Sequence, residues 1–131
     1  MQLSFRTLSI FTATLCLLLA LVWGVMPKWL LATWDIEYSL TAGLMARRIA
    51  VLFAALCVIF YRVRNEAPSP IRQALSYGFM VGCWGLAALG FGEWLNGHAG
   101  PGILLAVGFE LALGLAFFQT RRVSAELETA S

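Results

Sequence analysis

Four apolar runs constrain this chain more than any other feature of its sequence. They cover approximately residues 8–26, 42–63, 73–95 and 103–119, and short polar or proline- and glycine-rich connections separate them. About 20 apolar residues in a helix cross the hydrocarbon core of a bilayer, and a helix satisfies its own backbone hydrogen bonds there. The runs therefore predict an all-α fold: one membrane domain over residues 1–131, built as a bundle of four transmembrane helices, with a disordered tail over residues 120–131.

The composition fits a chain whose surface faces lipid. Hydrophobic residues make up 60% of the sequence and charged residues only 12%, whereas a soluble domain has about a quarter charged residues. The net charge of +2 is too small to indicate nucleic acid, so the lipid bilayer is the predicted partner. Cys16, Cys57 and Cys83 stand singly in three different runs, without the spacing of a metal site or a redox pair. No metal or cofactor is predicted.

The basic residues predict the orientation, because cytoplasmic ends of membrane helices are enriched in Lys and Arg. A cytoplasmic N-terminus places six arginines inside: Arg6, Arg62, Arg64, Arg72, Arg121 and Arg122. Only Lys28, Arg47 and Arg48 then lie outside, which favours an N-in, C-in chain. Residues 28–40 combine two tryptophans and a tyrosine with charges, as headgroup-region segments do. A short interfacial segment is therefore predicted after the first span.

Charged residues lie at depth in the second and fourth spans. The apolar body of the second run, Ile49 to Tyr61, is too short to cross alone, so its helix must include Arg47 and Arg48. Glu110 sits near the middle of the fourth run. Because a charge at the centre of a span costs ~2.5–3.5 kcal/mol on insertion scales, such residues normally face the bundle and pair.

Depth counting gives Glu110 a candidate partner. Arg48 lies 14 residues before Arg62, and Glu110 lies 11 residues before Arg121, on helices that both run inwards. At 1.5 Å per residue these positions are ~21 and ~16 Å above the inner surface, a gap that an arginine side chain covers. The hypothesis is a buried interhelical ion pair between Arg48, or Arg47, and Glu110.

Two other interpretations of these residues stay open. Arg47 could reach the outer headgroups or Glu93, near the outer end of the third run. The Glu110 site itself could be a structural clamp, a carboxyl kept protonated by the apolar medium, or a proton-coupled or substrate-binding site.

The third run carries a GxxxG motif, Gly78 and Gly82, which lets helix backbones approach closely. Packing against another helix of the same chain is the favoured interpretation, and a seam between two copies is the alternative.

Three short motifs carry a resemblance to a family. They are Met26-Pro27-Lys28-Trp29-Leu30-Leu31, Ala46-Arg47-Arg48, and Gly100-Pro101-Gly102 with Phe109-Glu110-Leu111. From residue 24 to 118 the chain resembles a broad group of small, uncharacterised four-span bacterial membrane proteins. The resemblance implies the architecture and an inner-membrane location, and it marks Arg47 or Arg48 and Glu110 as characteristic positions.

The sequence predicts no enzyme, since it contains no Ser/His/Asp set, phosphate loop or HExxH motif. The leading prediction is a small non-enzymatic multi-pass inner-membrane protein that acts through helix contacts with itself or a membrane partner. One alternative is an immunity protein against a pore-forming or membrane-targeted toxin. The other is a small dimeric proton-coupled transporter that uses Glu110.

Overall fold

The computed structural model describes residues 4–130, apart from the side chains of residues 123, 124 and 127. All secondary-structure elements of the described chain are helices: α1 (Phe5–Val25), α2 (Pro27–Thr33), α3 (Leu40–Val63), α4 (Pro70–Leu95) and α5 (Ile103–Ala130). Four of these are long and apolar enough to span a membrane: α1, α3, α4 and the Ile103–Arg122 part of α5. The prediction of an all-α chain with four such helices is confirmed.

Serine caps place the starts of three helices earlier than the apolar runs indicate. Ser4, Ser39 and Ser69 each hold an extended backbone, and each hydroxyl accepts a hydrogen bond from a backbone N–H in the first turn that follows. This is the N-cap arrangement that satisfies a helix's first free donors. Pro70 follows its cap at the first helical position, where a missing N–H costs nothing.

The structure corrects the prediction of a disordered tail over residues 120–131. Helix α5 continues without a break to Ala130, while residue 131 lies outside the described part of the chain. The sequence from Arg121 to Ala130 is rich in Ala, Glu, Leu and Arg, which have high helix propensity. Because the preceding span already supplies the costly first turn, the tail only has to extend an existing helix.

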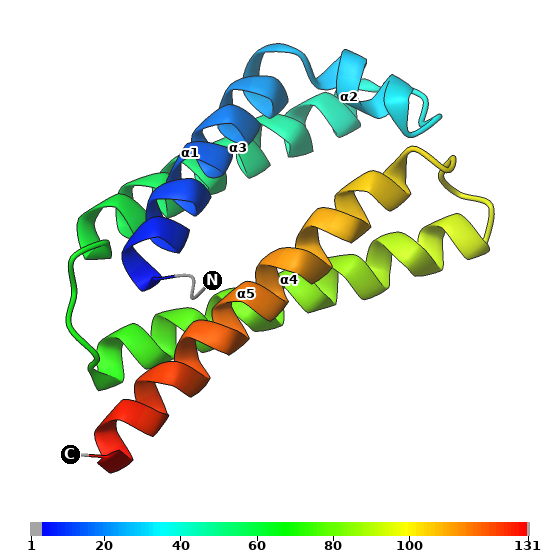
Figure 1. The fold of residues 1–131 in the computed structure, drawn as a ribbon. Coiled ribbons are helices and arrows are strands. Elements are labelled where there is room, and N and C mark those ends of the chain that lie inside the picture. Colours follow the sequence, from blue (N-terminus) through cyan, green and yellow to red (C-terminus); the bar gives the residue numbers. More distant parts are fainter. Residues whose placement is uncertain (1–3, 131) are drawn as a thin grey trace.

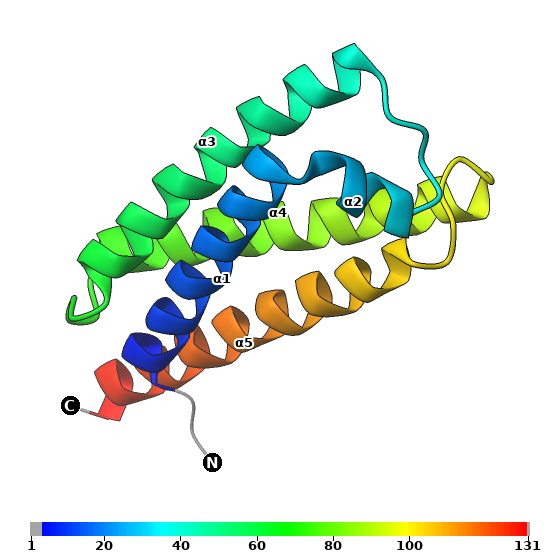
Figure 2. The ribbon, with the colours of Figure 1, turned by 90° about the horizontal axis from the view of Figure 1, so that it is seen from above.

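The helices form two antiparallel pairs. Figure 1 shows α1 lying along α3 and α4 lying along α5, and these two contacts dominate the packing of the molecule. The pairs meet at the end that holds the start of α1, and Figure 2 shows α1 and α5 diverging from there towards α2. The packing between the pairs is therefore concentrated at one end, which the predicted orientation makes the cytoplasmic end.

A cluster of phenylalanine rings joins the two pairs at that end. Phe60 and Phe117 are fully buried, and their ring centroids are 5.4 Å apart. Phe79 stacks edge-on against both rings, and Phe5 adds a T-shaped contact with Phe117 at 6.4 Å. Since one ring comes from each spanning helix, this cluster fixes how α1–α3 sits on α4–α5.

Contact at the opposite end is made by loops. The backbone N–H of Gly100, in the α4–α5 turn, donates a 2.7 Å hydrogen bond to the carbonyl of Trp34, just after α2. Gly102 lies directly against the Thr33 carbonyl, so a side chain at Gly102 would displace this contact. The end of α2, which follows the proline-led motif at residues 26–31, therefore meets the Gly-Pro-Gly turn in space.

Candidate functional site

Glu110 occupies the centre of the inward face of α5. Val107, Leu113 and Phe117 are buried on this face, and Glu110 falls between them at helical spacing. Its side chain is half-buried.

Arg47 and Arg48 are both exposed on α3. The buried residues of this part of α3 are Gly43, Ala46 and Ala50. At 100° per residue, Arg47 lies about 70° from the centre of that buried face and Arg48 about 170° from it. Arg48 is therefore on the side of α3 opposite α1, the face that a single chain leaves to lipid.

The structure does not bring the predicted ion pair together within one chain. Neither Arg47 nor Arg48 forms an ion pair with Glu110, and in Figure 2 helix α1 lies between the outer half of α3 and α5. Arg47 does not pair with Glu93 either. Glu93, in the last turn of α4, instead places Oε2 2.8 Å from Nδ1 of His98 in the turn that follows. Depth counting matched the levels of Arg48 and Glu110, but it carries no information on which way each helix faces.

Gly78 and Gly82 also do not make the contact that was expected with another helix of the same chain. Gly78 and Gly82 are exposed, and a Cβ placed on either would meet nothing within 4 Å. A Cβ on Gly85 or Gly92 would likewise meet nothing within 4 Å, and all four glycines lie on the side of α4 away from α5. The expected packing of Gly78 and Gly82 against another helix of this chain is therefore not made.

Two other glycines, Gly90 and Gly114, allow the close packing of two helices in this chain. A Cβ on Gly90 would lie 2.9 Å from Cγ2 of Val107, and the indole of Trp84 rests directly on Gly114. Both contacts join α4 to α5, where the absent side chains let the helices approach. Neither glycine belongs to a GxxxG motif, so spacing alone could not have found them.

Hydroxyls without a hydrogen-bond partner and free thiols lie in the bundle interior. The side chains of Ser9 and Thr12 on α1 are fully buried, and their oxygens have no hydrogen-bond partner. Cys16 and Cys83 are buried and Cys57 is half-buried, all as free thiols. Among residues 4–130, no group of three His, Cys, Asp or Glu residues is arranged to hold a metal ion. The interior is polar in places but contains no preformed metal site.

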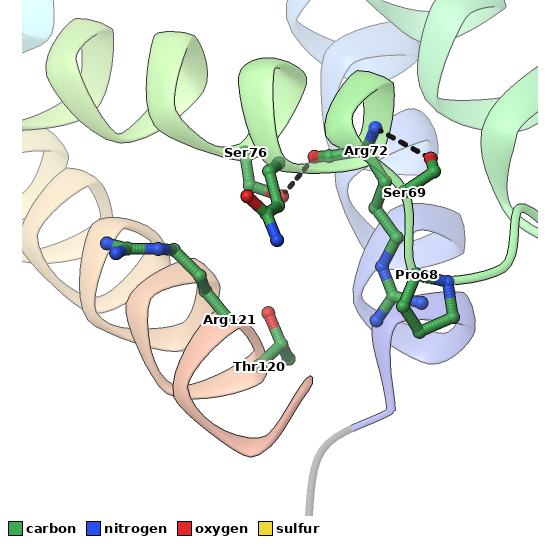
Figure 3. Close-up of a pocket in the computed structure, with 7 residues that line it drawn as sticks. Pro68, Ser69, Arg72, Ser76, Thr120 and Arg121 are labelled. Atoms are coloured by element: carbon green, nitrogen blue, oxygen red, sulfur yellow. Dashed lines mark hydrogen bonds between the residues drawn. The ribbon is translucent and has the colours of Figure 1, made fainter. Parts of the chain in front are cut away.

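A small pocket opens between the start of α4 and the part of α5 around Thr120. Its walls include Ser69, Arg72, Ser76, Thr120 and Arg121. Two arginines and three hydroxyls are the chemistry of an anion site. Figure 3, however, shows the Arg72 and Arg121 side chains pointing in different directions, and each guanidinium stacks on an aromatic ring, Phe5 and Tyr77 respectively. The hydroxyls of Ser76 and Thr120 donate to carbonyls of their own helices. The groups do not converge on one point in the pocket.

Comparisons of the chain with protein-family models, with curated protein sequences and with solved structures returned no match.

Proposed function

We propose that this chain is a non-enzymatic, multi-pass protein of a bacterial inner membrane that acts through helix contacts with a second copy of itself or with a membrane partner. One observation carries the proposal: Arg48 and Glu110 both lie in candidate spans, and neither forms an ion pair with another residue in the described part of the chain. Charges inside a bilayer normally pair or face protein and water. We therefore expect a protein neighbour to contact the exposed face of α3 that bears Arg48.

The open face of α4 supports the same proposal. The side of α4 that lacks a neighbour carries Gly78, Gly82, Gly85 and Gly92. Small residues at such spacing let a second helix approach closely, which is how many membrane helices associate when no water drives them together. Packing between the two helix pairs is also concentrated at one end, so their outer halves retain uncovered surface.

The finer features belong to the same proposal. The N-in, C-in orientation follows from the six arginines at one end of the spans, and α2 with the loop after it lies at the headgroup level of the opposite end. Membership of the small four-span bacterial group rests on the short motifs around Pro27, Arg48 and Glu110.

The experiment is a count of chains per particle in a bilayer. The full chain carries one fluorophore and is reconstituted into vesicles of phosphatidylethanolamine and phosphatidylglycerol over a range of protein-to-lipid ratios. Single-molecule photobleaching is expected to show a two-step population that rises with protein density and falls on dilution. Single-step bleaching at every density would exclude contacts with a second copy, and a heterologous partner would then have to be captured by cross-linking in native membranes.

A second candidate function is favoured by the environment of Glu110. A half-buried carboxyl without an ion-pair partner, in the centre of a spanning helix, is the usual feature of a proton-coupled transporter. Four helices rarely enclose a path alone, so this candidate also needs a dimer.

Proton flux separates the transporter from the leading proposal. Vesicles with an internal pH-sensitive dye are expected to show protein-dependent flux that Glu110→Gln abolishes if the chain is a transporter. Flux that Glu110→Gln leaves unchanged, or no flux above empty vesicles, would remove this candidate.

A further inference from the structure

We propose that a second copy of this chain docks on the outer half of α3, and that Arg48 of each copy pairs with Glu110 of the other. This inference rests on the proposed function and deepens it, because it names the occupant of the uncovered face and the residues that recognise it.

The face around Arg48 combines exposed apolar side chains with a single cation. Leu44 and Leu52 stand one turn before and after Arg48 on the same side of α3, and both are well exposed. Arg48 is thus a single cation in the middle of an apolar surface, two turns inside the helix that begins at Leu40. A neighbour that fits this face needs apolar side chains and one acidic group.

Glu110 is the acidic group that meets this requirement within the membrane. Of the seven acidic residues of the chain, Asp35, Glu37, Glu66 and Glu93 lie in or near the connecting loops, and Glu126 and Glu128 lie in the C-terminal extension of α5. Only Glu110 sits at the middle of a span, with Phe109 and Leu111 exposed beside it. A second copy of the chain therefore supplies both the charge and the apolar surroundings.

The depths of the two residues are compatible with a symmetric dimer. In one chain Arg48 lies ~21 Å and Glu110 ~16 Å above the inner row of arginines. A two-fold axis along the membrane normal leaves every depth unchanged, so the same match holds between copies. The symmetry also forms the contact twice, since Arg48 of each copy then meets Glu110 of the other. Two unpaired charges per chain become two pairs per dimer.

The facing directions favour pairing between copies over pairing within one. Arg48 points away from α1, whereas α1 lies between the outer half of α3 and α5. Glu110 is half-buried on the inward face of α5, so part of its side chain remains accessible to a neighbour.

Two charge-reversal variants, studied alone and mixed with each other, test the inference. The full chain is prepared as wild type, Arg48→Glu and Glu110→Arg, each labelled with a donor or an acceptor dye, in vesicles of phosphatidylethanolamine and phosphatidylglycerol. Energy transfer gives the dissociation constant of each combination. Each single variant alone places like charges at both contacts, so its own dimer is expected to weaken at least about tenfold. Mixing the two variants places opposite charges at both contacts and is expected to restore the wild-type constant.

Arg47→Glu is the matched control, because it makes the same charge change one residue away on a different side of α3. It is expected to leave the dissociation constant within about twofold of wild type, well below the tenfold step of 1.4 kcal/mol. Arg48→Gln and Glu110→Gln, which bring no repulsion, guard against loss of folding and are expected to weaken the dimer less than the reversals do.

The outcomes separate this inference from the proposed function. A wild-type chain that stays monomeric overturns both the inference and self-association. A wild-type dimer that neither reversal weakens leaves the proposed function standing and overturns the pairing. Reversals that weaken their own dimers but are not rescued by mixing also overturn it, since rescue between copies requires the contact to cross the interface.

Discussion

Replacing Phe117 by alanine measures how strongly the ring cluster holds the two helix pairs together. Phe117 is fully buried and lies 5.0 Å from Phe79, 5.4 Å from Phe60 and 6.4 Å from Phe5, between ring centroids. Aromatic pairs within 4.5–7 Å contribute ~0.5–1.5 kcal/mol each, so three pairs give ~1.5–4.5 kcal/mol.

This value does not include a free energy for transferring the Phe117 ring out of water. In a soluble core, Phe→Ala costs ~3–5 kcal/mol, part of which is transfer of the ring from water. In a bilayer the unfolded helices keep Phe117 in hydrocarbon, so only the packing contacts are lost. We therefore expect the free energy of unfolding to fall by ~1.5–4.5 kcal/mol.

The assay is reversible unfolding in mixed micelles with increasing dodecyl sulfate, followed by tryptophan fluorescence at concentrations where the chain is monomeric. Phe109→Ala is the matched control, because Phe109 is on the same helix but 51% exposed. The control is expected to change the free energy of unfolding by less than ~0.5 kcal/mol. If Phe117→Ala costs no more than Phe109→Ala, the ring cluster does not hold the pairs together and the reasoning is refuted.

Three further predictions test the packing, a helix start and the topology. Gly114→Leu is expected to destabilise the monomer by ~1–3 kcal/mol in the same assay, because the Trp84 indole occupies the space that a side chain needs. Gly82→Leu, on the open face of α4, is expected to cost less than ~0.5 kcal/mol; equal costs would contradict the assignment of the two faces. Ser69→Ala removes the cap of α4 and is expected to cost ~1 kcal/mol, seen as faster hydrogen exchange in its first turn, whereas Ser69→Asp keeps an acceptor; unchanged exchange in Ser69→Ala would refute the capping role. A membrane-impermeant maleimide is expected to label Asn96→Cys in intact spheroplasts and Asn65→Cys only after lysis, as an N-in chain requires; the reverse pattern would invert the orientation.

Much of the fold could be read from the sequence because a bilayer leaves few alternatives. The four apolar runs match the four long helices, although the first run extends one residue past the end of α1. Most of the other boundary differences come from Ser4, Ser39 and Ser69, whose capping role is a local signal that hydropathy overlooks. The helical tail was missed for a different reason. Polarity after Thr120 indicates departure from the membrane, but the Ala- and Glu-rich segment keeps a high helix propensity in water.

The candidate site was harder to predict because it depends on how the helices are rotated. Counting residues gave the depths of Arg48 and Glu110, which set their levels in the membrane but not their facing directions. The same limit applies to the glycines: Gly78 and Gly82 match a motif yet face outwards, while Gly90 and Gly114 carry the close contact of α4 with α5. Rotation is decided by packing partners far away in the sequence, such as Trp84 on Gly114.

Cross-linking between two differently marked copies tests the central claim, a dimer built on Arg48 and Glu110, most directly. In a background without Cys16, Cys57 and Cys83, one copy carries Arg48→Cys and the other Glu110→Cys, so that one native charge pair remains in the mixed dimer. Mild oxidation or a short bifunctional thiol reagent in native membranes is expected to produce a covalent dimer from the mixture and far less from either variant alone. A mixture that yields no more dimer than the separate variants would contradict the claim.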